Sequence, residues 1–111
     1  MSCMFSGAFS FNQPLANWDT SKVTNMSCMF GEATSFNQPL ANWDTYKVTS
    51  MECMFQGALS FNQSLVDWDI SSVGNFDDML DGTTSLDPAH AVSFHQKMDD
   101  QMQTDYYRRF H

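Results

Sequence analysis

Residues 36–45 read FNQPLANWDT, the same ten letters occupy residues 11–20, and a diverged copy, FNQSLVDWDI, occupies residues 61–70. The copies are 25 residues apart, and residues 4–28 match residues 29–53 at 19 of 25 positions. Self-similarity at a fixed short period is typical of repeat proteins, in which each unit buries its apolar face against the next. We therefore expect stacked coils rather than a compact fold with a single central core.

Most positions that recur in the repeat are apolar, as a stacked interior requires. We expect each recurring position to become a column that runs along the stack. The columns are Met4/Met29/Met54/Met79, Phe5/Phe30/Phe55/Leu80, Ala8/Ala33/Ala58, Phe11/Phe36/Phe61/Leu86, Leu15/Leu40/Leu65, Trp18/Trp43/Trp68, Val23/Val48/Val73 and Met26/Met51/Phe76.

Within one coil, the spacing of Leu15, Trp18 and Thr20 matches the L-x-x-L-x-L strand signature of leucine-rich repeats. A strand there would send Trp18 and Thr20 inward and leave Asp19 on the opposite face. Apolar residues at 23–33 recur at spacings of three and four, which predicts a helical or 3₁₀ arc. The predicted fold class is an α/β solenoid, a leucine-rich-repeat-like array of about three 25-residue coils with one short parallel strand per coil.

The segment that begins at Asp87-Pro88 breaks the repeat and predicts a helix, with Asp87 as N-cap and Pro88 at the first helical position. An apolar stripe follows at steps of four, formed by Phe94, Met98, Met102, Tyr106 and Phe110. We predict two regions, a repeat array over residues 1–86 and a C-terminal capping α-helix over residues 87–111. No matching cap precedes Met4, so the N-terminal end of the stack should expose apolar surface and be prone to association.

Composition excludes several classes of function. The chain has 5 Lys and Arg against 13 Asp and Glu, a formal net charge of −8, which disfavours nucleic acid and suits a basic partner. No apolar run is long enough to span a bilayer. The first residues lack the features of a secretory signal, but they begin mid-repeat, and we expect the chain to be part of a longer array.

The repeat strings resemble the BspA-like leucine-rich surface repeat, in the variant found in mycoplasma-type lipoproteins and other bacterial surface proteins. The resemblance covers roughly residues 3–86 and includes 36–45, Lys47-Val48-Thr49, Met51, Met54-Phe55 and Gly57-Ala58. It implies an extracellular or cell-surface location, adhesion and binding of host or matrix proteins, and it brings no catalytic residues. The segment from Asp87 onward departs from this pattern.

The predicted binding surface is the polar side of the strand column. Tyr46 replaces the serine found at this position in the other coils, and an exposed aromatic suits an interface. The surface consists of Asn17, Asp19, Asn42, Asp44, Tyr46, Asp67 and Asp69.

Two interpretations of the aspartates remain open. Asp44, Asp67 and Asp69 could bind a hard cation such as Ca²⁺, which takes several oxygen ligands. The alternative, which we favour, is a solvated column whose side chains accept hydrogen bonds from nearby backbone N–H groups. We accordingly predict no metal and no cofactor.

Other reactive residues carry weaker signals. Cys3, Cys28 and Cys53 form a column that allows one disulfide and one free thiol, or three free thiols, which we favour slightly. His90, His95 and His111 lack the spacing of a zinc or catalytic site. Asn25 and Asn62 begin glycosylation sequons, or are turn asparagines that pair with the backbone.

The predicted function is a non-enzymatic, protein-binding repeat module of a surface or secreted adhesion-type protein. The alternative is a structural or scaffolding subunit of a larger assembly, docked through the exposed Met4 and Phe5 end or through the C-terminal helix.

Overall fold

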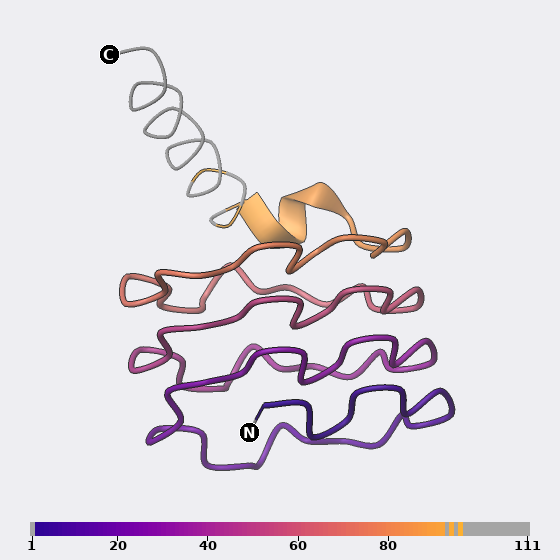
Figure 1. Cartoon of the computed structure of the whole chain (residues 1–111), viewed down its shortest axis with the longest axis horizontal. Helices are drawn as coiled ribbons and strands as arrows, with labels where there is room; N and C mark the ends of the chain where they lie inside the picture. The colour runs from indigo at the N-terminus through magenta and orange to yellow at the C-terminus, as the bar shows by residue number, and fades with distance from the viewer. Residues whose placement is uncertain (1, 93, 95, 97–111) are drawn as a thin grey trace.

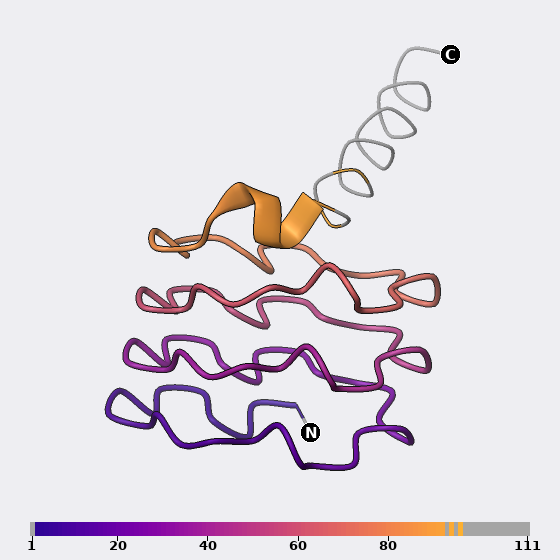
Figure 2. The ribbon, with the colours of Figure 1, turned by 180° about the vertical axis from the view of Figure 1, so that it is seen from behind.

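The chain winds into coils that stack along one axis, with the N-terminus at one end and the C-terminal segment at the other (Figure 1, Figure 2). This computed structural model describes residues 2–92, 94 and 96. A 3₁₀ helix, η1, spans Pro88–Ala91. No helix within the described residues is long and apolar enough to cross a bilayer.

Backbone hydrogen bonds between neighbouring coils run along one arc of each coil. The N–H groups of Cys28 and Phe30 donate to the carbonyl oxygens of Glu52 and Met54, both at 2.8 Å. The same bonds join the coils before and after, from Cys3 to Ser27, Phe5 to Met29, Cys53 to Asp77 and Phe55 to Met79. The arc that includes residues 26–32 is therefore the paired side of the second coil.

The predicted α/β solenoid with a parallel strand in each coil is wrong. Within the described part of the chain, strand pairing is limited to isolated parallel bridges from Asn25 to Ser50 and from Ser50 to Asn75. The segment expected to be a strand is a turn, because the N–H of Trp43 donates to the carbonyl of Leu40 at 3.0 Å. A β-turn whose two ends face inward produces the same Leu-x-x-Trp spacing as a leucine-rich strand, which explains the error.

The arc that was expected to be helical is also a run of turns. The N–H of Gly31 donates to the carbonyl of Cys28, and that of Ala33 to Phe30, both at 3.0 Å. Cys28 and Glu32 both have φ of 57°, the left-handed region that ends a right-handed helix. The equivalent residues of the other coils are left-handed too, namely Cys3, Gly7, Cys53, Gly57, Asp78 and Gly82.

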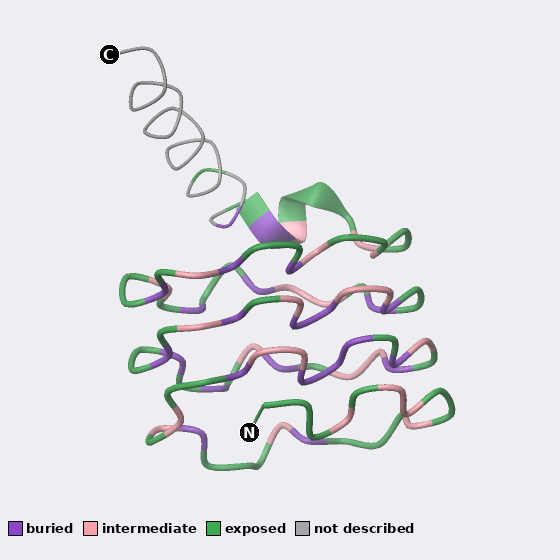
Figure 3. Ribbon diagram, in the orientation of Figure 1, coloured by how far each residue is buried: buried purple, intermediate pink, exposed green. Residues whose placement is uncertain are grey.

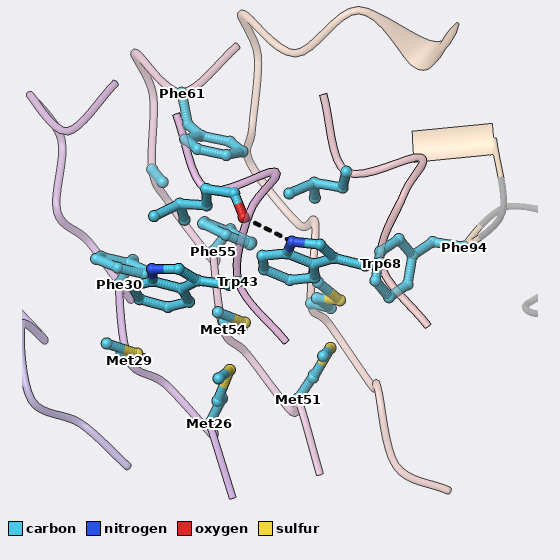
Figure 4. Packing of buried hydrophobic residues seen from close by; sticks show 14 of the residues in the cluster. Met26, Met29, Phe30, Trp43, Met51, Met54, Phe55, Phe61, Trp68 and Phe94 are labelled. Carbon is cyan, nitrogen blue, oxygen red and sulfur yellow. Dashed lines mark hydrogen bonds between the residues drawn. The ribbon is translucent and has the colours of Figure 1, made fainter. Parts of the chain in front are cut away.

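The recurring apolar residues of the second and third coils form the buried core of the stack, and Figure 3 marks the buried positions of these coils in purple. The rings of Phe5, Phe30 and Phe55 stack in one column, with centroids 5.6 and 5.4 Å apart. Phe11, Phe36 and Phe61 form a second column, at 5.8 and 6.1 Å. Figure 4 shows the methionines and aromatic rings of successive coils packed together. Near-identical coils therefore place near-identical side chains on top of one another, as the period predicts.

The C-terminal segment lies on the last coil. Asp87 is the N-cap of η1 and its side chain accepts a hydrogen bond from the N–H of Ala89. The carbonyl of His90 accepts from the N–H of Leu65 at 2.8 Å, and the ring of Phe94 meets that of Trp68 edge-on at 6.4 Å. The segment thus begins as a 3₁₀ helix, and the described residues that follow it, Val92, Phe94 and Gln96, are α-helical, as predicted for this part of the chain. Residues 97–111, with the predicted stripe from Met98 to Phe110, lie outside the described residues.

Candidate binding surface

Asp19, Asp44 and Asp69 each stabilise a turn. The Oδ1 atom of Asp19 accepts hydrogen bonds from the N–H of Ser21 at 3.0 Å and from its hydroxyl at 2.6 Å. Asp69 makes the same two bonds with Ser71. These are the local side-chain-to-backbone bonds that favour aspartate in turns.

Buried threonine hydroxyls hold these turns side by side. The Oγ1 atom of Thr20 donates to the carbonyl of Asp44 at 3.0 Å, and that of Thr45 donates to the carbonyl of Asp69 at 3.0 Å. Both threonines are almost fully buried. In the third coil this position is Ile70, which packs against the apolar interior. The three aspartates therefore occupy adjacent turns of consecutive coils.

All seven predicted binding residues are exposed, so the structure places them on the surface as expected. We call the set Asn17, Asp19, Asn42, Asp44, Tyr46, Asp67 and Asp69 the acidic turn face. It is built from turns and carries no strand.

Hydrogen bonding lowers the pKa of Asp19. The hydroxyl of Ser21 is the largest influence that lowers the pKa of the Asp19 carboxyl, and the Ser21 N–H lowers it further. The charge of Lys22 adds to this shift, while desolvation opposes it. Because these donors bond the charged form, the pKa of Asp19 lies below its ordinary value.

Negative charge increases along the acidic turn face. In the first two coils, Asp19 and Asp44 are each followed three residues later by a lysine, Lys22 or Lys47. In the third coil the corresponding residue is Ser72, and Asp67 replaces the asparagines of the earlier coils. The third coil therefore contributes two negative charges to the face without a local cation.

Tyr46 is an exposed aromatic residue in the middle of this face, with 52% of its surface accessible. Its N–H donates to Asp44 Oδ1 at 3.1 Å, so the turn is kept although the hydroxyl of Ser21 and Ser71 is missing. Lys47 Nζ lies 5.8 Å from the centre of the ring, within cation–π range.

Metal binding by the aspartates is not supported. Among the described residues, no group of three or more His, Cys, Asp or Glu side chains is arranged to hold a metal ion. Asp44 and Asp69 instead accept hydrogen bonds from Tyr46 and Ser71, which is the alternative we favoured.

A second polar column, formed by asparagine side chains, was only partly foreseen. Asn12 Oδ1 accepts from the N–H of Asn37, Asn37 Oδ1 from that of Asn62, and Asn62 Oδ1 from that of Asp87, each at 2.9 Å. His90 Nδ1 also lies 3.0 Å from Asn62 Oδ1. The recurrence of asparagine every 25 residues was the available signal. Between the first three coils, the column lies where the described residues form no backbone-to-backbone bonds from one coil to the next.

Both sequon asparagines accept hydrogen bonds from backbone N–H groups, Asn25 within its own turn and Asn62 from the next coil. Asn25 Oδ1 accepts from the N–H of Ser27 at 2.8 Å, and Asn62 belongs to the asparagine column. His95 and His111 lie outside the described residues.

Cys3, Cys28 and Cys53 are free thiols in adjacent coils. Burial is the largest influence on Cys28 and, with the neighbouring thiols of Cys53 and Cys3, raises its pKa to about 11. Burial also raises the pKa of Cys53, as do the charges of Glu52, Asp78 and Asp77, against a hydrogen bond from Cys28 that lowers it. Raised pKa values mean little thiolate at neutral pH, so Cys28 and Cys53 are not activated nucleophiles.

These features define a class of repeat protein, built from turn-rich 25-residue coils that share an interior and carry periodic polar columns. The chain belongs to the family described as Mycoplasma protein of unknown function, DUF285, whose model matches residues 1–100. Searches of curated proteins and of solved structures found no match.

Proposed function

We propose that this chain is a non-enzymatic protein-binding repeat module and that the acidic turn face engages a protein partner of basic character. The observation that carries the proposal is the alignment of exposed polar side chains on three consecutive coils. Thr20 and Thr45 fix that alignment through their bonds to Asp44 and Asp69. Repeat proteins commonly bind through such extended surfaces.

The charge of the face supports a basic partner. The formal net charge of the chain is −8, and the third coil adds Asp67 and Asp69 without a lysine nearby in sequence. Complementary charge steers association and excludes partners of the same sign. Tyr46 supplies an amphipathic ring at the centre, of the kind enriched at interfaces.

A surface or secreted adhesion role is the setting we propose for this binding. It is supported by the resemblance of the repeat strings to BspA-like leucine-rich surface repeats, as mycoplasma-type lipoproteins carry them.

Charge removal on the third coil tests the face. The double variant D67N/D69N removes two charges and keeps the Oδ1 acceptor that the Ser71 turn needs. Binding of a short oligolysine peptide at low salt, measured by calorimetry, should weaken by about two- to tenfold. The matched control D78N/D81N removes the same charge from the paired arc and should leave binding nearly unchanged.

Two results would count against the proposal. Equal weakening in D67N/D69N and D78N/D81N would mean that only net charge matters. Unchanged binding in D67N/D69N would remove the acidic turn face from consideration.

A second candidate function is a structural subunit of a larger assembly. The observation that favours it is the apolar N-terminal end, where Met4 is 50% and Trp18 is 42% exposed. Purification of the chain as part of a stable complex would support this role. A full chain that binds its protein partner as a free monomer would contradict it.

A further inference from the structure

The N-terminal end of the stack exposes residues whose counterparts in the next coil are buried. Met4 is 50% exposed and Met29 is 0% exposed. Trp18 is 42% exposed and Trp43 is 3% exposed. Figure 3 shows exposed and intermediate residues along the first coil, where the next coils contain many buried ones. The first coil therefore has an interior-type apolar surface on its outer side.

The same end carries backbone groups arranged for a neighbouring coil. Inside the stack, the carbonyls of Ser27, Met29 and Gly31 accept from Cys3, Phe5 and Gly7 of the coil before. The carbonyls at the equivalent places of the first coil belong to Ser2, Met4 and Ser6. None of the three accepts a hydrogen bond from a described residue.

Several hydrogen-bond donors at this end also lack the partner that their counterparts have inside the stack. The N–H of Thr49 donates to Thr24, the N–H of Asn37 donates to Asn12, and Trp43 Nε1 donates to Leu15. The equivalent donors of the first coil are the N–H groups of Thr24 and Asn12 and Nε1 of Trp18. Within residues 2–92, 94 and 96 these donors have no acceptor.

We propose that the N-terminal face of the first coil is an interaction surface for a further coil of the same 25-residue pattern, docked in register through its C-terminal side. The face continues the coil-to-coil interface already present inside the chain, with the same apolar columns and the same order of donors and acceptors. An unrelated apolar surface would leave the carbonyls of Ser2, Met4 and Ser6 unpaired, which is costly once they are buried.

A second copy of this chain does not offer the required side. The C-terminal segment covers its last coil at Leu65 and Trp68, because His90 of η1 accepts from Leu65 and Phe94, after η1, packs edge-on against Trp68. The occupant is therefore a coil whose C-terminal side is open. This inference shares the exposed end with the second candidate function and is independent of the acidic turn face.

Extension of the full chain tests the proposal. A copy of residues 26–50 fused directly before Met1 keeps the 25-residue register, and it places a leucine carbonyl where Trp18 Nε1 would find its acceptor. Hydrogen exchange, followed by NMR, should slow by about tenfold or more at the Trp18 indole and at the amides of Asn12 and Thr24. The melting temperature should rise by about 4–8 °C or more.

The matched control carries the same 25 residues in reverse order and should change neither quantity. Equal protection by the reversed segment, or no protection by the in-register copy, would overturn the proposal. A third result would also overturn it, namely an unextended chain that forms a dimer in which Trp18 is already protected, because the occupant would then be a second copy.

Discussion

The indole Nε1 of Trp43 donates a 2.9 Å hydrogen bond to the backbone carbonyl of Leu15 in the preceding coil. Trp68 repeats the bond to Leu40 at 2.8 Å, drawn as the dashed line in Figure 4. The two indole rings stack 6.5 Å apart and nearly parallel. One side chain therefore contributes both apolar area and a hydrogen bond between coils, in a place where the backbone forms turns and not a sheet.

Replacement of Trp43 by phenylalanine should lower the free energy of unfolding by about 1–3 kcal/mol, because the buried Leu15 carbonyl loses its donor and part of the ring is removed. Urea denaturation measures the change. The control is Trp18→Phe, at an exposed end with no such bond, and its cost should be less than half as large. Equal costs would mean that the indole bond contributes little.

Replacement of Glu32 by glycine should raise the free energy of unfolding by about 1 kcal/mol. Glu32 is exposed and has φ of 57°, whereas the equivalent residues of the neighbouring coils are Gly7 and Gly57. Glycine adopts this conformation without the steric cost of a Cβ atom, and thermal or urea unfolding would show the gain.

The opposite substitution, Gly57→Ala, should destabilise the chain. Gly57 has φ of 71°, and an added Cβ would lie 3.3 Å from Cγ of Glu32. A Glu32→Gly variant no more stable than the parent would show that the glutamate gains an interaction that compensates for its backbone conformation.

The sequence period was sufficient to predict which residues are buried in the second and third coils, where Met29, Phe36 and Leu65 are all fully buried, but Met4 and Trp18 of the same columns are exposed in the first coil. It could not distinguish a strand from a turn, because Leu40 and Trp43 have the spacing that either would produce. Left-handed residues were equally hard to foresee, since Cys28 and Glu32 are neither glycine nor asparagine.

The candidate surface was easier to predict than the backbone that carries it. Asp44 lies between the buried Trp43 and Thr45, and Asp19 and Asp69 occupy the same position in their coils, so alternation of buried and exposed residues was sufficient to predict their exposure. Their turn-forming hydrogen bonds depend on whether Ser21, Tyr46 or Ser71 follows two residues later, and the replacement of serine by Tyr46 was visible in the sequence. The buried bonds of Thr20 and Thr45 require the coil stacking itself.

Replacement of Asn37 by alanine should cost about 1–2 kcal/mol. Asn37 Oδ1 accepts from the N–H of Asn62 at 2.9 Å and from Gln63 Nε2 at 3.0 Å, so one truncation removes two bonds between coils. Asn17→Ala is the control on the exposed turn face and should change stability by less than about 0.5 kcal/mol. Similar losses in both variants would argue against a structural role for the asparagine column.

Stability should fall with rising pH because of Cys28. Its pKa is raised from 9.0 to about 11 in the folded chain, chiefly by burial. Below pH 9 the thiol is protonated in both states and has no effect on folding. Between pH 9 and 11 the unfolded chain releases the proton first, so the unfolded state is favoured and the free energy of unfolding decreases. Urea denaturation at pH 8 and pH 10.5 would measure the loss.

The comparison with Cys28→Ser isolates this contribution, because tyrosine and lysine titrate in the same range in both chains. The variant should lose less stability than the parent between the two pH values.

Alkylation gives a second measurement, since a thiol with a pKa near 11 has about 100-fold less thiolate at pH 8 than one near 9. Cys28 should therefore react with iodoacetamide far more slowly in the folded chain than in urea. Equal rates in the two states, together with identical pH profiles for parent and variant, would show that the thiol column is open to solvent and that the coils do not close over it.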